Sequence, residues 1–167
     1  MKKEFMNLLN QAYDLNENGE YEEALLCYEK ILDKDPENIR ALIDKGVTFQ
    51  NLENFKKSII FYDQALKINP NNIDALINKG STLHSQGKFH DAIVLYDKVL
   101  ELDKKCAIAL AYKGLSLGEL DKIQDALKYF KKALEIDSDY ELANLSKQMA
   151  KEILKSKLKG LQHSKTL

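Results

Sequence analysis

The sequence lacks tryptophan and contains only two cysteines and two prolines in 167 residues. Cys27 and Cys106 are far apart and have no metal-ligand spacing around them, so we expect two free thiols, as in a reducing compartment. No apolar run approaches the roughly 18–20 residues that a membrane span requires. Asn7, Asn10 and Gln11 interrupt any signal-peptide core at the start of the chain. These absences predict a cytoplasmic protein.

Charge of neither sign is in clear excess, because 25 basic residues stand against 26 acidic ones. The distribution is uneven, however. From Lys147 onward there are six lysines and one acidic residue, Glu152, so this end carries +5 and the preceding chain −6. A mildly acidic body lacks the clustered Lys and Arg that a nucleic-acid surface needs. The charge therefore predicts no nucleic-acid partner.

What the chain does contain is an internal repeat with a period of 34 residues, which gives units at 5–38, 39–72, 73–106 and 107–140. Position 4 of each unit is leucine, position 8 is small, position 11 is large, position 20 is small and position 24 is aromatic. Position 4 holds Leu8, Leu42, Leu76 and Leu110, and position 8 holds Ala12, Gly46, Gly80 and Gly114. Position 11 holds Leu15, Phe49, Leu83 and Leu117. Position 20 holds Ala24, Ser58, Ala92 and Ala126, and position 24 holds Tyr28, Tyr62, Tyr96 and Phe130.

Each unit is predicted to be a hairpin of two helices, helix A at positions 1–14 and helix B at positions 17–30. Apolar residues recur at helical spacing within both stretches, and a polar break such as Asn18-Gly19-Glu20 separates them. A glycine in mid-helix costs roughly 0.5–1 kcal/mol relative to alanine. The glycines at position 8 therefore predict a close approach of helix B, and we expect the small residues at position 20 to be the point of contact.

These residues resemble the tetratricopeptide repeat, a 34-residue helix-turn-helix family. Its pattern is large at position 4, small at 8, large at 11, small at 20, aromatic at 24, small at 27 and proline at 32. The second unit follows it most closely, with Ala65 and Pro70 at the last two positions. The resemblance implies an all-α fold, an α-solenoid of four hairpins that forms a right-handed superhelix. Lys104 and Ser138 replace proline at position 32, so helix B is expected to end less sharply there.

A further helix is predicted at 141–158, since apolar residues continue at helical spacing there. They are Leu142, Leu145, Met149, Ile153 and Leu154. A terminal repeat needs a cap with a polar outer face, which Lys147, Lys151 and Lys155 can provide. We expect one domain over 1–160 and a flexible tail at 161–167.

The resemblance also implies where a ligand binds: positions 2, 5, 6, 9, 12 and 13 of the helices A line an inner groove that takes peptides or helices of partner proteins. Positions 5 and 9 form a nearly continuous apolar stripe with polar flanks, which is typical of an interaction surface. Some of these side chains could instead bury against the next helix A. The candidate groove residues are Leu9, Tyr13, Ile43, Asp44, Val47, Ile77, Asn78, Ser81, His84, Ile108, Tyr112 and Leu115.

The groove does not match the subfamily that clamps the C-terminal carboxylate of chaperones with lysine and asparagine. In two possible registers the matching residues are Leu9, Tyr13, Asp44, Asp74 and Asn78, or Ile43, Val47, Asn78, Ile108 and Tyr112, without a cation. A weakly acidic groove should favour an apolar or basic amphipathic segment. Residues 151–161 of the chain are such a segment, so a homo-oligomer through the C-terminal helix is possible. Contact of this segment with an anionic membrane surface is the alternative, but a capping helix accounts for the same residues, so no membrane partner is predicted.

The function predicted is a protein–protein interaction scaffold that binds a peptide or helix in its groove. The alternative is a structural, self-assembling subunit that uses the groove or the C-terminal helix. Helical-repeat binding of RNA is disfavoured because it usually needs a basic groove.

Residues suited to catalysis or to metal binding are few. His84, His90 and His163 have no Cys, Asp or Glu at metal-ligand spacing, and neither cysteine has a histidine partner in sequence. Every glycine belongs to a helix or to a turn between helices, so there is no phosphate-binding loop. We expect no enzyme activity, no cofactor and no metal.

Lysine recurs at position 7, which is usually apolar, as Lys45, Lys79 and Lys113. Its aliphatic stem is expected to lie along the core edge with the ammonium group in water. A functional row of lysines is the alternative.

Overall fold

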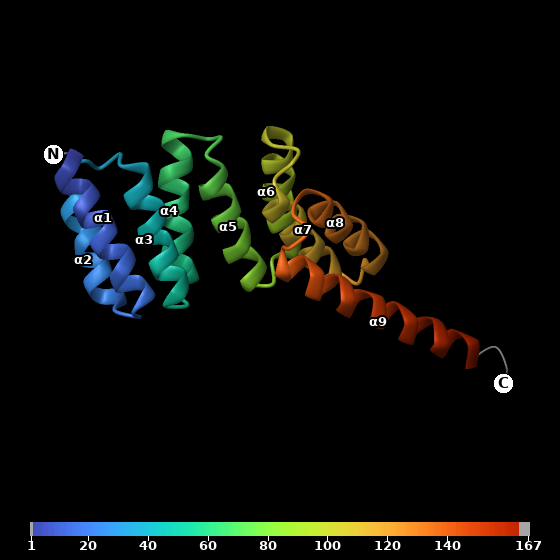
Figure 1. Cartoon of the computed structure of the whole chain (residues 1–167). Coiled ribbons are helices and arrows are strands. Elements are labelled where there is room, and N and C mark those ends of the chain that lie inside the picture. The colour runs from blue at the N-terminus through green and yellow to red at the C-terminus, as the bar shows by residue number, and fades with distance from the viewer. Residues whose placement is uncertain (1, 164–167) are drawn as a thin grey trace. The chain divides into compact units, whose positions relative to one another are not determined.

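The computed structural model describes residues 2–163, with side chains for 3–156, and within this part the chain forms nine α-helices and no strand (Figure 1). The helices are α1 (Lys2–Glu17), α2 (Tyr21–Leu32), α3 (Ile39–Asn51), α4 (Phe55–Ile68), α5 (Ile73–Ser85), α6 (Phe89–Leu102), α7 (Ala107–Glu119), α8 (Ile123–Ile136) and α9 (Glu141–His163). The odd-numbered helices α1 to α7 are the helices A of the four repeats, and α2 to α8 are the helices B. The predicted all-α solenoid of four hairpins is confirmed.

The C-terminal helix is longer than expected. α9 begins at the predicted residue but continues to His163, so residues 161–163 of the expected tail are helical. Residues 164–167, the rest of that tail, lie outside the described residues.

The helices group into two compact units, Met1–Thr82 and Leu83–Leu167, with the boundary inside α5. In the first unit α1 packs on α2, α2 on α3 and α3 on α4. In the second, α6 packs on α7, α7 on α8 and α8 on α9, while α9 also touches α7. Packing between neighbours along the chain is the arrangement of a repeat array. The single domain over 1–160 and the right-handed superhelix stay predictions.

All four turns from helix A to helix B have the same backbone conformation. Position 15 is left-handed in each, with φ of 80° at Gly19, 55° at Glu53, 74° at Gly87 and 60° at Asp121. The next amide donates back to the carbonyl five residues earlier, as Lys122 N does to Leu117 O at 2.9 Å. This is the bonding of a Schellman motif, which satisfies carbonyls at the end of a helix.

An aromatic ring at position 24 fills the space above the glycine at position 8. A Cβ atom on Gly46 would lie 2.5 Å from Cε1 of Tyr62, and one on Gly114 would lie 2.6 Å from Cε1 of Phe130. The atoms nearest to such a Cβ atom belong to the ring and not to the small residue at position 20, where the contact was expected. Position 20 is fully buried, as at Ala126, but the ring is what requires glycine.

Helix B ends independently of proline, contrary to expectation. α6 and α8, which lack it, end at Leu102 and Ile136, the same repeat position at which α4 ends. Only α2 ends earlier, at Leu32.

Candidate functional site

The groove positions of the first unit divide between core and surface. Leu9 and Ile43 were expected in the exposed stripe, but both are buried, Ile43 in a cluster with Tyr62 and Ala75. They pack against neighbouring helices and cannot contact a ligand directly. Tyr13, in contrast, is 61% exposed.

The side chains of this unit that remain accessible define what we call the first-unit surface. It comprises exposed Tyr13 and the partly exposed Asp44, Val47, Ile77, Asn78 and Ser81. All of them come from α1, α3 and the part of α5 that belongs to this unit.

The predicted groove residues of the second unit are all at least partly accessible. Ile108 is 45% exposed, and His84, Tyr112 and Leu115 are partly buried. Four predicted groove residues therefore lie together in this unit, on the end of α5 and on α7.

The sequence analysis expected lysines to form the outer face of α9, but several apolar residues of this helix are exposed as well. Leu145 and Met149 are each 56% exposed and Ile153 is 42% exposed, whereas Ala143 and Ala150 are buried. The missed signal is the repeat itself, because the 34-residue period continues into α9 and places Leu145 and Met149 at groove positions 5 and 9.

These residues extend the groove positions of the second unit. His84, Ile108, Tyr112 and Leu115 together with Leu145, Met149 and Ile153 are named the second-unit surface. α9 otherwise has the polar residues of a cap: positions 4, 8 and 11, which face helix B in the repeats, are Asn144, Gln148 and Lys151.

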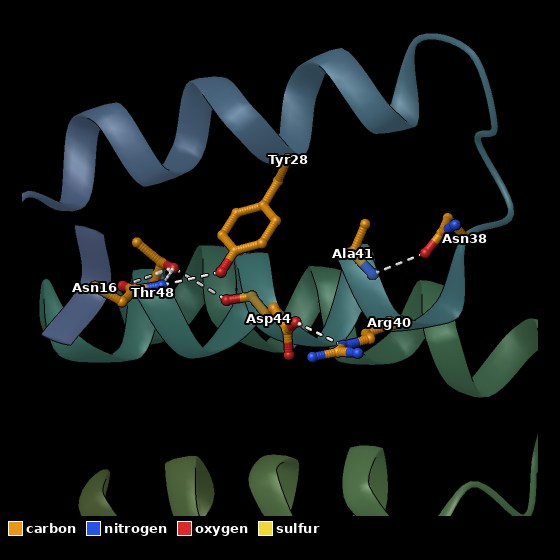
Figure 2. A network of polar contacts seen from close by, with 7 residues as sticks. All are labelled: Asn16, Tyr28, Asn38, Arg40, Ala41, Asp44 and Thr48. Atoms are coloured by element: carbon orange, nitrogen blue, oxygen red, sulfur yellow. Dashed lines mark hydrogen bonds and ion pairs between the residues drawn. The ribbon is translucent and has the colours of Figure 1, made fainter. Parts of the chain in front are cut away.

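Carboxylates lie on the first-unit surface. Asp44 forms an ion pair with Arg40, with 3.5 Å between Oδ2 and Nε (Figure 2). Burial raises the pKa of the Asp44 carboxyl; Arg40 opposes this shift and the Asp74 carboxylate adds to it. The carboxylate is therefore partly withdrawn from water while it stays paired with Arg40.

Beneath the surface, a polar side chain at position 12 joins two hydroxyl groups, an arrangement that we call a rung. Asn16 Nδ2 donates to the Tyr28 hydroxyl at 3.0 Å and to Thr48 Oγ1 at 2.9 Å (Figure 2). In the next rung, Tyr62 and Thr82 donate to Gln50 Oε1 at 3.2 and 2.7 Å. Each rung thus connects position 24 of its own repeat with position 10 of the next helix A.

The third rung is incomplete and the fourth is apolar. His84 Nδ1 bonds Ser116 Oγ at 2.9 Å, but the buried Tyr96 hydroxyl has no hydrogen-bond partner among the described residues. In the last repeat the three positions are Gly118, Phe130 and Ala150, which leave no polar group to satisfy.

Replacing His84 with glutamine should complete the third rung and stabilise the protein by about 1 kcal/mol, the net value of one hydrogen bond. In the second rung the side chain of Gln50 contacts the hydroxyl groups of both Tyr62 and Thr82. A glutamine at position 84 should therefore reach the hydroxyl groups of Ser116 and Tyr96. Urea denaturation of the variant measures the gain, with Tyr96→Phe as the comparison. An equal gain from His84→Gln in the Tyr96→Phe background would contradict the explanation.

The position-7 lysines have buried stems, as predicted, but their ammonium groups are paired with acids instead of lying free in water. Lys45 bonds Glu29 at 3.1 Å and Lys79 bonds Asp63 at 2.6 Å. Lys113 bonds Asp97 in the same way and also lies over the ring of Tyr129, 4.4 Å from its centroid. The partner acid is at position 25 of the preceding helix B each time, so the row of lysines ties successive repeats together.

Chemistry other than binding has little support in the part of the chain that is described. No three His, Cys, Asp or Glu side chains within it come close enough to hold a metal ion. Burial raises the pKa of the Cys27 thiol, which makes it a poorer nucleophile. Burial also lowers the pKa of His84. Among the described helices, none is both long and apolar enough to cross a membrane.

The fold and its accessible helix-A surfaces define an α-helical repeat protein. Family models described as tetratricopeptide repeat match residues 7–38, 39–72, 61–94 and 107–140. The chain belongs to the tetratricopeptide repeat family, and its fold is that of a protein-interaction scaffold. Among curated protein sequences, none matches it.

Several solved structures share the fold. The MamA protein superposes with a TM-score of 0.75 at 19% identity, over 99% of this chain and 90% of that one. A tetratricopeptide repeat protein from Parabacteroides merdae gives 0.75 at 22% identity, over 92% of this chain and 61% of that one. The first repeat domain of Spaghetti (RPAP3), bound to the HSP90 peptide SRMEEVD, gives 0.67 at 20% identity, over 72% of this chain and 95% of that one.

Proposed function

We propose that this protein is a non-catalytic scaffold that binds an apolar or basic amphipathic segment of a partner protein on its helix-A surfaces. The observation that carries the proposal is the presence of exposed apolar side chains at groove positions in each unit, Tyr13 in the first and Ile108, Leu145 and Met149 in the second. Exposed apolar groups with a polar rim are typical of a binding surface. A cytoplasmic location is part of the proposal, since Cys27 and Cys106 are free thiols.

The charge around these surfaces supports a basic ligand. Asp44 and Asp74 lie on the first unit, and Glu119 and Glu152 lie on the second, while Arg40 is already paired with Asp44. A segment with alternating Leu and Lys would pair both its apolar and its charged face.

A neighbour of the same fold, RPAP3, holds a peptide, which supports binding of a segment on this fold. Its ligand SRMEEVD is acidic, however. The groove positions here provide carboxylates where an acidic peptide would need cations, so we expect a ligand of opposite charge.

Binding of a synthetic 18-residue amphipathic helix of leucine and lysine, followed by fluorescence anisotropy, tests the proposal. Tyr13→Ser combined with Ile108→Ser should weaken its affinity about tenfold, equivalent to about 1.4 kcal/mol. Asp44→Asn should weaken it a few-fold without loss of stability, because the raised pKa means that the charge opposes folding at neutral pH.

The matched control is Leu26→Ser, since Leu26 is an equally exposed apolar residue but lies on α2, a helix B. It should leave the affinity unchanged. Equal weakening by the control, or equal binding of a peptide with the same residues in scrambled order, would contradict the proposal.

Self-association is a second candidate function, and the exposed apolar face of α9 favours it. Leu145, Met149 and Ile153 lie on the C-terminal helix, next to its lysine-rich end, while the rest of the chain is acidic. A mass that rises with protein concentration in light scattering would support this candidate, and a constant monomer mass would exclude it.

A further inference from the structure

Residues of α6, α7 and α8 line a cleft of about 630 Å³ in the second unit. Its apolar part is formed by Ile93, Val94, Leu117 and Tyr129. Val94 is 65% exposed, so an apolar group that enters the cleft would remove it from water. No residue of the cleft belongs to the second-unit surface, so the cleft is a separate candidate for binding.

The charged groups of this cleft are mainly basic. Among the described residues that line it, one acid, Asp125, stands against four lysines, Lys113, Lys122, Lys128 and Lys132. Asp125 is paired with Lys128 at 2.9 Å, and Asp97 adds a second acid by its ion pair with Lys113. With four lysines and these two acids, the cleft carries a charge of +2.

The ring of Tyr129 brings two of these lysines next to the apolar part of the cleft. Nζ of Lys113 lies 4.4 Å from the centre of the ring, and Nζ of Lys132 lies 5.3 Å from it. Cation–π attraction holds both ammonium groups beside this ring. The ligand that complements such a cleft has carboxylates next to a large apolar side chain.

The first unit has a cleft at the corresponding repeat positions, but its charge is different. Two acids, Glu22 and Glu29, and one base, Lys57, line it. At position 16 it has Asn54, where the second unit has Lys122, and at position 18 it has Glu22, where the second unit has His90. The basic charge of the second-unit cleft is therefore not a consequence of the repeat pattern.

We propose that the second-unit cleft binds an acidic segment of a partner protein, with an apolar side chain of the segment on Val94 and Tyr129 and its carboxylates at Lys122 and Lys132. This ligand is opposite in charge to the one proposed for the helix-A surfaces. The two ligands contact different side chains, so a scaffold of this kind joins two partners without competition between them.

The test is the binding of a labelled 12-residue peptide of glutamate and leucine to the full-length protein, measured by fluorescence anisotropy. Lys122→Glu with Lys132→Glu should weaken its affinity about tenfold, because each substitution turns an attraction into a repulsion. The substitutions should leave helical circular dichroism unchanged, since both residues are exposed and Lys122 makes no side-chain capping bond at the start of α8.

The matched control is Lys88→Glu with Lys131→Glu, which changes the net charge by the same amount. Lys88 precedes α6 as Lys122 precedes α8, Lys131 is the neighbour of Lys132, and neither control residue lines the cleft. The control should leave the affinity within about twofold of the wild type, since exposed charges outside the cleft are screened by salt.

The apolar contact has its own pair of variants. Val94→Ser should weaken binding about threefold, because it removes apolar surface from the contact. Ile60→Ser should leave it unchanged, since Ile60 is the exposed residue at the same repeat position of the first unit.

Equal weakening by the two lysine pairs, equal weakening by Val94→Ser and Ile60→Ser, or no saturable binding to the wild-type protein would overturn the cleft as a binding site. Vesicles of phosphatidylcholine and phosphatidylserine and a 12-nucleotide single-stranded DNA are the comparison probes. Binding of either one as tightly as the peptide would overturn the choice of an acidic protein segment.

Discussion

Replacing Gly114 with alanine should destabilise the protein by up to about 2 kcal/mol, although alanine is the better helix former. A Cβ atom there would lie 2.6 Å from Cε1 of Phe130. That ring is buried in a cluster with Leu117, Ile123 and Ala126, so it has no room to move. The cost of overpacking, roughly 1–3 kcal/mol, should exceed the gain in helix propensity of about 1 kcal/mol.

The same substitution at Gly118 should have the opposite effect on the stability of the protein. Gly118 lies one turn further along α7, and a Cβ atom there meets no described heavy atom within 4 Å beyond its own helix and chain neighbours. Gly118→Ala should therefore stabilise the protein by about 0.5–1 kcal/mol. Urea denaturation of both variants measures the difference. If both changed stability in the same direction, the ring contact would not be the reason for glycine at position 8.

Replacing Gln50 with leucine should cost about 2 kcal/mol, because it removes the acceptor for a buried phenol. The Tyr62 hydroxyl donates to Gln50 Oε1 at 3.2 Å, and Tyr62 is fully buried. Thr82 retains a contact with Ser58 at 3.3 Å, whereas the Tyr62 hydroxyl loses the amide oxygen to which it donates. An unpaired buried polar group costs about 1–3 kcal/mol.

Adding Tyr62→Phe should recover most of this loss. The double variant imitates the last repeat, in which Gly118 and Phe130 replace the same pair. The measurement is a double-mutant cycle in urea, with an expected coupling of about 1–2 kcal/mol. Additive effects would show that the rung does not act as a unit.

The sequence was sufficient for the fold because the period of 34 residues sets the hairpins, the turns and the core together. Tyr62 and Gly46 could both be assigned to the core from the pattern. Which atoms are in contact could not be predicted, because helix periodicity gives the face on which a residue lies but not how far its side chain reaches. The atoms nearest to a Cβ atom on Gly46 therefore belong to the ring of Tyr62 and not, as expected, to Ser58.

The candidate site was less predictable, for a reason that Leu9 and Ile43 illustrate. The angle of a residue around its own helix shows whether it faces helix B of the same hairpin. It does not show whether the adjacent hairpin covers the residue. In α9 the error was reversed. Leu145 and Met149 were left out of the candidate groove because the repeat was taken to end at residue 140.

The pairing of lysine at position 7 with an acid at position 25 governs how this chain can be lengthened. The first three helices B offer an acid there, but the fourth has Lys131, and Lys147 already occupies position 7 of α9. Lys131 and Lys147 therefore occupy the two positions that hold an ion pair at the three earlier junctions. A copy of the second or third hairpin would find a carboxylate for its position-7 lysine if it were inserted after any of the first three hairpins, but not if it were placed after the fourth.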